Sequence, residues 1–200
     1  MSTAITASTV SLPEALHTAR LRLLPAHEDL AARTAAFFCR NAAHLAPWEP
    51  PSPPDFATEA FQRRRLRQHT SDQSAGTVMR WWLEPAGEAD RLVGHVSLTQ
   101  IARGPFQNAM LGYALEDTLQ GSGLMQEALR AVVACAFSPA VNLHRIQASV
   151  RPENARSVAV LQRLGFEQEG RAREYLYIDG AWRDHLLFAL RNAAFMGVPQ

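Results

Sequence analysis

The stretch from residue 108 to residue 137 constrains the fold of this 200-residue chain more than any other part of it. It opens with the strand-like pattern "NAMLGYALE" and ends, over residues 122–137, with apolar side chains that recur at helical spacing. Between the two lie Gly121 and Gly123, which are free to adopt positive φ angles. A strand that passes through glycines into a helix predicts an α/β domain, and it makes the turn a candidate phosphate-binding site.

The other patterns extend this prediction to one mixed α/β (α+β) domain with a central sheet of about seven strands and flanking helices. Strand patterns occupy residues 19–25, 77–85, 91–101, 108–116 and 144–152, and a hairpin at 173–190 turns at Asp179-Gly180. Further helices are expected at 27–45, at 55–72 with Asp55 as N-cap, and at 154–166 with Asn154 as N-cap and Gly165 as the terminating residue. We expect a flexible arm at 1–17, the domain at 18–191 and a tail at 192–200.

Composition excludes several classes of function. The net charge of +1 gives no general electrostatic reason to bind nucleic acid or a membrane. The N-terminal residues lack the pattern of a secretory signal, and no apolar run approaches the roughly 20 residues that span a bilayer, so a cytoplasmic protein is expected. The seven histidines show no metal-ligand spacing, which predicts no metal. The run "RRRLR" (63–67) is typical of a solvated helix face, with a ribosome contact as the alternative.

Three glycine-rich sequence motifs are candidates for a phosphate-binding turn between a strand and a helix. The nucleoside-triphosphate loop needs a lysine, and all 20 basic residues of this chain are arginine. The dinucleotide fingerprint needs a third glycine, but this chain has Gln126 at that position. It also needs an acidic residue about twenty positions further on, and none occurs between Glu127 and Glu153. The pattern Q-x-x-G-x-G/A fits better, with Gln120 and Gly123 in place, because successive backbone N–H groups and the positive helix end hold a pyrophosphate. A glycine turn without a ligand is the remaining alternative.

A second motif adds a family resemblance. The pattern N-x-x-S-x-x-x-L-x-x-L-G-F-x-x-E-G over residues 154–170, joined to the glycine loop at this distance, resembles the GNAT (GCN5-related) N-acetyltransferase superfamily over roughly residues 18–191. Three stretches resemble the RimJ-like bacterial ribosomal-protein-alanine N-acetyltransferases: "HLAPWEP" (44–50), "LGYALEDTLQGSGLMQEAL" (111–129) and "YLYIDGAWRDHLLFAL" (175–190).

The resemblance implies the GNAT fold, in which the fourth and fifth strands of the expected sheet (108–116 and 144–151) splay apart. The pantetheine arm of acetyl-CoA lies in the gap and pairs with exposed backbone as an added strand would. Met125 departs from the small residue of the general motif, which puts the finer loop geometry in doubt. The cofactor-binding residues implied are Tyr113, Ala114, Leu115, Gln120, Gly121, Ser122, Gly123, Leu124, Met125 and Asn154. Asn154 is expected to cap its helix, with a bond to pantetheine as an added role.

The implied reaction is direct attack of a neutral amine on the thioester, so the site must position the reactants and move two protons. An α-amine titrates near pH 8 and is about a quarter neutral at pH 7.5, so it needs only a modest base or a water relay. Glu116 and Asp117 are the candidate bases, with surface helix-capping carboxylates as the alternative. Many superfamily members carry a tyrosine acid where this chain has Leu161, so we expect Ser157 to protonate the leaving thiolate, unless it is an ordinary first-turn polar residue.

The acceptor groove is expected between the loop after residue 45 and the final hairpin. Its candidate residues are Trp48, Glu49, Tyr175, Tyr177 and Asp184, with His185 nearby. Trp48 and Tyr177 have packing as an alternative role, and Asp184 could brace the hairpin. The expected acceptor is the N-terminal alanine of a ribosomal protein. A small amine is the alternative acceptor, and a non-catalytic acyl-CoA-binding module is the alternative class. The sequence leaves monomer and homodimer equally open.

Overall fold

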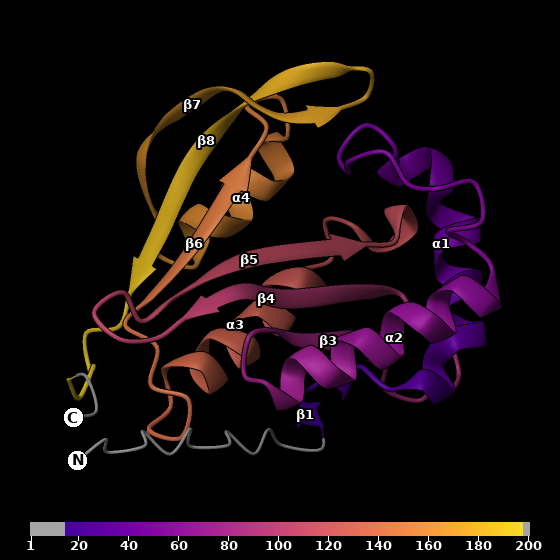
Figure 1. Ribbon diagram of the computed structural model, residues 1–200, viewed down its shortest axis with the longest axis horizontal. Coiled ribbons are helices and arrows are strands. Elements are labelled where there is room, and N and C mark those ends of the chain that lie inside the picture. Colours follow the sequence, from indigo (N-terminus) through magenta and orange to yellow (C-terminus); the bar gives the residue numbers. More distant parts are fainter. Residues whose placement is uncertain (1–14, 198–200) are drawn as a thin grey trace, which may run out of the picture.

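The computed structural model describes residues 15–197 and contains one central sheet of eight strands in the order β1-β2-β3-β4-β5-β6-β8-β7 (Figure 1). Neighbouring strands run antiparallel except for the parallel pair β5 and β6. The strand beyond the expected seven or so is the short β1. The strands are β1 (Leu16–His17), β2 (Leu21–Pro25), β3 (Met79–Pro85), β4 (Gly94–Ala102), β5 (Asn108–Leu115), β6 (Arg145–Val150), β7 (Glu167–Ile178) and β8 (Ala181–Arg191).

Two pairs of helices cover the two faces of the sheet. The helices are α1 (Ala31–Leu45), α2 (Glu59–Ser74), α3 (Leu124–Phe137) and α4 (Ala155–Arg163), with single 3-10 turns at Glu28–Leu30 and Asp117–Leu119. Apolar residues of α1 and α2 pack with Trp82 in one buried cluster. Apolar residues of α3 and α4 pack against the other face, together with Trp81. Alternate side chains of a strand point to opposite faces, which explains why these adjacent tryptophans serve different clusters.

The parallel pair separates part-way along its length, as expected (Figure 1). Residues 108–111 of β5 pair with residues 145–148 of β6. Beyond that point, residues 112–115 of β5 still pair with β4, whereas Ser149 and Val150 of β6 pair with β8. One side of the β5 backbone over residues 112–115 is therefore left without a neighbouring strand.

Local signals fix several element boundaries. Asn154 caps α4, because its Oδ1 accepts from the backbone N–H of Ser157 at 3.1 Å. Gly165 ends this helix with a φ of 84°, and the N–H of Phe166 donates to the carbonyl oxygen of Leu161 at 3.0 Å, as in a Schellman motif. The hairpin turns at Asp179-Gly180, where both φ angles are positive as the tight primed turn requires. These three predictions are confirmed.

The predicted cap of α2 was wrong. Residues 54–57 form turns before the helix, and the hydroxyl of Thr58 accepts from the N–H of Phe61 at 3.3 Å. The same hydroxyl donates to the carbonyl oxygen of Asp55 at 2.7 Å, so Asp55 belongs to the preceding turn. Proline-rich sequence ahead of the helix delays its start by four residues relative to the expected boundary, from residue 55 to Glu59.

The ends of the domain differ slightly from the expected boundaries. Leu16 and His17 pair with Leu23 and Arg22, so the sheet begins before residue 18. Residues 1–14 of the expected arm and 198–200 of the expected tail lie outside the described residues. Asn192 is buried and donates to the carbonyl oxygen of Leu143 at 3.0 Å, which ties the start of the tail to the domain. None of the helices within residues 15–197 is long and apolar enough to cross a bilayer.

Candidate active site

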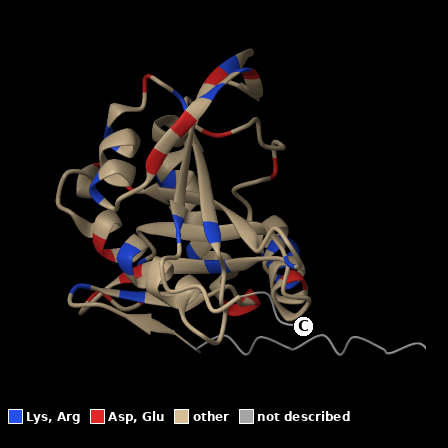
Figure 2. Cartoon of the chain, turned by 90° about the vertical axis from the view of Figure 1, so that its left-hand side faces the viewer, with Lys and Arg blue, Asp and Glu red and all other residues tan. Residues whose placement is uncertain are grey.

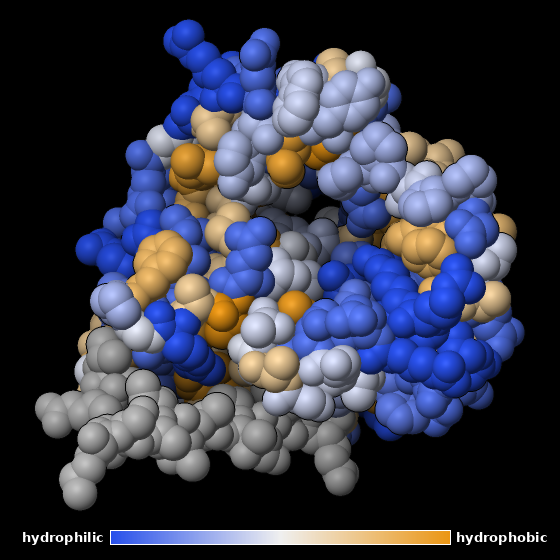
Figure 3. Space-filling view, viewed as in Figure 1, coloured by the Kyte–Doolittle hydropathy of each residue, from blue (hydrophilic) through white to orange (hydrophobic). Residues whose placement is uncertain are grey.

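A cleft of about 1290 Å³ opens where β5 and β6 diverge. Its walls come from β4, β5, β6, the glycine loop, the first turns of α3 and α4, and the end of α1 with the loop that follows. Figure 3 shows the hollow between the hairpin β7–β8 and the side of the molecule that carries α1 and α2. One continuous cavity therefore joins the glycine loop to the loop after α1.

The glycine loop at one end of the cleft has the backbone conformation that the sequence predicts. Gly121 and Gly123 adopt φ angles of 76° and 81°, in the left-handed region that glycine enters without strain. The N–H groups of residues 121–123 donate to no other group among the described residues, and α3 begins directly afterwards. Arg20, directly before β2, supports the loop by donating to the carbonyl oxygen of Ser122 at 3.0 Å and pairing with Glu127 at 2.7 Å. The loop is thus held in place with its N–H groups free.

Gln120 is fixed at the entrance to the same loop. Its Nε2 lies 2.8 Å from Nε2 of His44, near the end of α1, and its Oε1 accepts from Arg156 in the first turn of α4. Both neighbours line the cleft, and sequence reasoning missed both as well as Arg20. Basic and amide groups contributed by three separate elements therefore surround the loop, which is suited to a pyrophosphate.

The unpaired backbone of β5 forms the adjoining wall. Tyr113, Ala114 and Leu115 line the cleft at the point where β6 has turned away. The phenol of Tyr113 donates to the carbonyl oxygen of Ser157 at 3.3 Å, and its burial raises the pKa of Tyr113 to about 12. Free strand backbone beside free loop N–H groups fits the amides and the diphosphate of coenzyme A, which supports the cofactor residues predicted from the sequence.

Ser157 and Asn154 lie together at the α4 side of the cleft. The side chain of Asn154 is used as a helix cap, through its Oδ1. The backbone of Ser157 is held at both the N–H and the carbonyl, and its side chain lies beside the phenol of Tyr113, whose pKa it helps to lower. This placement suits Ser157 for a proton-transfer role, which stays a prediction.

Glu116 and Asp117 lie outside the lining of the cleft. Glu116 is buried, and its carboxylate pairs with Arg91 at 2.8 Å and with Arg40 at 3.5 Å. Asp117 is exposed and lies 3.6 Å from Nδ1 of His44 and 3.9 Å from Arg156, which both line the cleft. The ion pairs give Glu116 a structural role beneath the turn, and a role of either carboxylate as the base stays a prediction.

Trp48 and Glu49 line the cleft in the loop after α1. The guanidinium of Arg151 stacks over the Trp48 ring at 5.4 Å. Oε1 of Glu49 lies 3.8 Å from Nε2 of His95, a buried residue near the start of β4. Burial raises the pKa of Glu49, but His95 and the nearby positive charges of Arg65 and Arg80 outweigh that effect and hold it below its usual value. Glu49 is therefore an ionised carboxylate inside the cleft.

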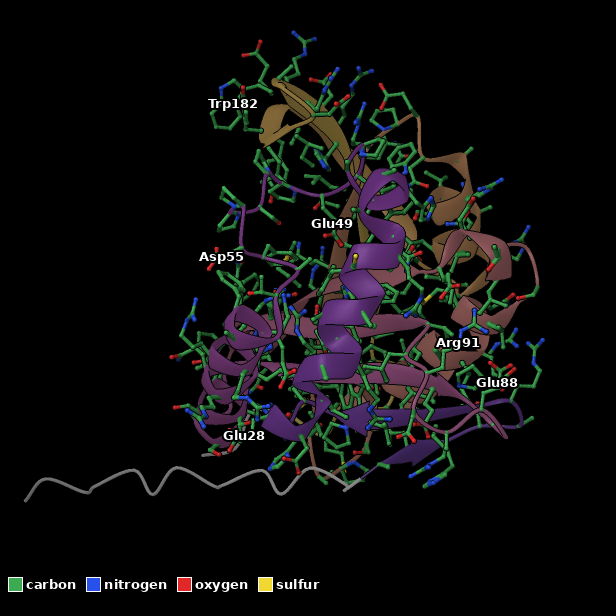
Figure 4. The ribbon with its side chains drawn as sticks, turned by 90° about the vertical axis from the view of Figure 1, so that its right-hand side faces the viewer. Glu28, Glu49, Asp55, Glu88, Arg91 and Trp182 are labelled. Carbon is green, nitrogen blue, oxygen red and sulfur yellow. The ribbon has the colours of Figure 1, made fainter. Side chains whose placement is uncertain are left out.

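The three hairpin residues predicted to bind the acceptor do not line the cleft. Asp184 accepts from the N–H of Glu174 at 2.9 Å and pairs with Arg171 at 2.7 Å, so it braces the hairpin, which was the alternative role given to it. Tyr175 and Tyr177 are 40% and 46% exposed, and the Tyr175 ring lies 5.5 Å from the ring of His185. An acceptor role for these three residues stays a prediction. His185 does line the cleft. Figure 4 shows Trp182 at the far end of the hairpin, well away from Glu49.

The arginine-rich stretch of α2 divides into two groups. Arg63, Arg64 and Arg67 pair with Glu59, Asp55 and Glu28 on the surface. Arg65 instead lines the cleft, where it is joined by Arg80 of β3. Elsewhere, basic and acidic residues are interspersed on the face shown in Figure 2. Sequence reasoning missed Arg80 and His95 as cleft residues; the available signal was a charged or polar residue inside an otherwise apolar strand.

No group of three or more His, Cys, Asp and Glu side chains within residues 15–197 is arranged to hold a metal ion. The chemical groups that the cleft presents are backbone N–H donors, arginines, serine and tyrosine hydroxyls, side-chain amides, histidines and the carboxylate of Glu49. These groups can bind a phosphorylated carrier at one end and an amine at the other.

Comparisons with known proteins agree with this geometry. A family model described as an acetyltransferase (GNAT) domain matches residues 20–167. The chain is 37% identical, over 88% of its length and 89% of the relative, to the ribosomal protein uS5-alanine N-acetyltransferase of Escherichia coli (strain K12). A solved ribosomal-protein-S5-alanine acetyltransferase from Vibrio fischeri matches with a TM-score of 0.87 and 34% identity, over 92% of this chain and 99% of that one. Mycobacterium smegmatis RimJ in complex with CoA-disulfide matches with a TM-score of 0.81 and 32% identity, over 89% and 85%. The chain therefore belongs to the GNAT family of N-acetyltransferases.

Proposed function

We propose that this enzyme transfers the acetyl group of acetyl-CoA to the α-amine of an N-terminal alanine on a ribosomal protein, in the cytoplasm. The observation that carries the proposal is the single cleft that joins the glycine loop to Trp48 and Glu49. It supplies a carrier site and an acceptor site on either side of the gap between β5 and β6. The alanine acceptor rests on the near full-length similarity to enzymes that modify the alanine of uS5.

The reaction needs no covalent enzyme intermediate. The neutral amine attacks the carbonyl carbon of the thioester, the carbon–sulfur bond breaks, the nitrogen loses a proton and the departing thiolate gains one. We propose that Ser157 passes a proton to the thiolate, because its hydroxyl lines the cleft beside the unpaired backbone of β5. Because an α-amine titrates near pH 8, Glu49 or a water molecule is a strong enough base to take the proton from the nitrogen.

A panel of acceptors tests the proposal. The enzyme is incubated with acetyl-CoA and peptides that begin with Ala, Ser or Met, beside small amines, and release of free CoA is followed together with the mass of each peptide. We expect Ala-starting peptides to be acetylated fastest. The same Ala peptide with a blocked N-terminus is the matched control, and it should gain no acetyl group. Turnover confined to small amines would overturn the ribosomal acceptor, and absence of turnover with every acceptor would overturn the catalytic role.

A further inference from the structure

The acceptor end of the cleft contains a buried charge without a protein partner. Arg80, the second residue of β3, lines the cleft and is 9% exposed. Its Nε and Nη1 are buried and have no hydrogen-bond partner among the described residues. Burial, together with the positive charge of Arg65, lowers the pKa of Arg80 to about 9, so its guanidinium is still charged at neutral pH. A buried cation with unsatisfied donors is costly unless a ligand or water pairs with it.

The groups around Arg80 leave an excess of positive charge. Arg65 also lines the cleft, and its guanidinium stacks over Phe56 and Phe38 at 4.9 and 5.4 Å. Glu49 is the one carboxylate among the described residues that line the cleft, and no ion pair joins it directly to Arg80. Burial lowers the pKa of His95, so this residue adds no charge near neutral pH. Two guanidinium groups therefore face one carboxylate, which favours a second anionic group from a ligand.

We propose that Arg80, with Arg65 beside it, binds a carboxylate that the acceptor carries within about two residues of its reactive amine, while Glu49 faces the amine. The inference rests on the proposed function and narrows its substrate class. Guanidinium groups hold carboxylates through paired, charge-assisted hydrogen bonds, so a carboxylate would satisfy the unpartnered donors. The carboxylate can be an acidic side chain near the N-terminus of a peptide or the α-carboxylate of a free amino acid.

The simplest rival is that Arg80 serves only to keep Glu49 ionised. In that case the donors of Arg80 would point at Glu49, whereas no ion pair joins the two side chains, and Nε and Nη1 have no partner among the described residues. The two roles also differ in consequence. An indirect electrostatic role affects every acceptor equally, whereas a carboxylate-binding role affects only acceptors that carry a carboxylate.

Isosteric acceptor pairs separate these possibilities in the wild-type enzyme. Ala-starting peptides with Glu or Gln at the second position, and with Asp or Asn at the third, are compared by kcat/KM, beside free alanine and alaninamide. We expect the carboxylate member of at least one pair to be preferred by about tenfold or more, as for a hydrogen bond to a charged group. A preference within the peptide pairs identifies an acidic side chain, and one confined to free alanine identifies the α-carboxylate. Equal kcat/KM within every pair would overturn the proposal.

Variants then assign the preference to Arg80. Arg80→Met should remove the preference by raising KM for the carboxylate member about tenfold or more, with KM for the amide member and for acetyl-CoA changed far less. Arg80→Lys keeps the charge and should retain part of the preference. Arg64→Met is the matched control, because Arg64 is exposed on α2 and lies outside the cleft. An equal loss for both members of every pair in Arg80→Met would contradict carboxylate binding.

The failure of this inference is distinct from a failure of the proposed function. If Ala-starting peptides are acetylated but show no dependence on a nearby carboxylate, the carboxylate site is wrong and the acetyl transfer stands. If no peptide is acetylated and free amino acids are, the ribosomal acceptor is wrong, and the comparison of alanine with alaninamide still tests the role of Arg80. Circular dichroism and CoA binding of Arg80→Met show whether the variant is folded.

Discussion

Among single side chains of the cleft, Ser157 is held in place by its backbone. Its N–H donates to Asn154, and its carbonyl oxygen accepts from Tyr113 at 3.3 Å. Both bonds position the residue in the first turn of α4, with its side chain beside the Tyr113 phenol. Tyr113, whose pKa burial raises to about 12, is a poor proton donor near neutral pH. These contacts make Ser157 the better candidate for protonating the thiolate.

We therefore expect Ser157→Ala to lower kcat about ten- to a hundredfold, in the lower range for loss of an acid–base group, with little change in CoA affinity. Ser157→Thr retains a hydroxyl and should recover part of the rate. Steady-state kinetics and calorimetric titration with CoA measure the two effects. Weaker CoA binding with an unchanged kcat would argue that Ser157 only contributes to the carrier site.

Sequence could identify the residues of the glycine loop and, through the family resemblance, Trp48 and Glu49, but not Arg80. Gln120 and Gly123 form a local pattern whose function depends on backbone, so a short stretch of sequence is enough to recognise it. Arg80 and Glu49 come together only because β3 and the loop after α1 face the same cavity. The ion pairs of Glu116 could not be predicted, because Arg91 and Arg40 are distant from it in sequence.

Among secondary-structure elements, the turn from β5 into α3 depends most on residue type. Gly121 and Gly123 have φ angles of 76° and 81°, whereas Gly170 in β7 has an ordinary φ. A Cβ at Gly121 or Gly170 would meet nothing within 4 Å, and one at Gly123 would meet only Nη2 of Arg20 at 3.6 Å. Space is therefore not the constraint at these positions, and backbone conformation is.

Gly121→Ala and Gly123→Ala should each lower the free energy of unfolding by about 1–2 kcal/mol, the cost of a left-handed conformation for a residue with a Cβ. They should also weaken CoA binding, because the loop N–H groups move as the strain is relieved. Gly170→Ala is the matched control and should change neither quantity. Urea denaturation and calorimetric titration measure them, and equal behaviour of all three variants would contradict the argument.

The order and type of the elements followed from hydrophobic periodicity and turn residues, because those signals are local. The divergence of β5 from β6 came only with the family resemblance, since both strands carry an ordinary apolar pattern along their whole length. The start of α2 was misplaced because Asp55 and Thr58 are both good caps, and only the preceding turns decide between them. Competition between such local signals decides where an element begins, whereas the existence of every element except the short β1 could be predicted.

For the domain as a whole, the buried His95 and the partly buried His69 link stability to pH. Burial, with the positive charges of Arg80 and Arg65 and the neighbouring His95, lowers the pKa of His69 to about 3, and burial also lowers that of His95. In the unfolded chain both groups titrate near 6.5. As the pH falls below that value, the two histidines bind protons in the unfolded state but not in the folded state, so the free energy of unfolding falls.

We expect Tm to drop by about 4 °C between pH 7 and pH 5.5, a range above the ordinary pKa of the carboxylates, and to be nearly constant from pH 7 to pH 8. His69→Gln removes one of the two groups and should reduce the drop. Scanning calorimetry at fixed ionic strength measures both proteins. A His69→Gln protein whose Tm falls as steeply as that of the wild type would show that this histidine does not contribute.

The early parting of β5 from β6 has a mechanical consequence. The half of the sheet that contains β1–β5 pairs with the half made of β6, β8 and β7 through only four residues of each strand, 108–111 and 145–148. A pantetheine arm lying in the gap would supply hydrogen bonds that β5 and β6 do not make with each other. Acetyl-CoA would therefore stabilise the sheet as well as deliver the acetyl group. Dissociation of free CoA would remove these hydrogen bonds. The two halves of the sheet could then separate more easily along the gap between β5 and β6, which would favour release of the acetylated chain end.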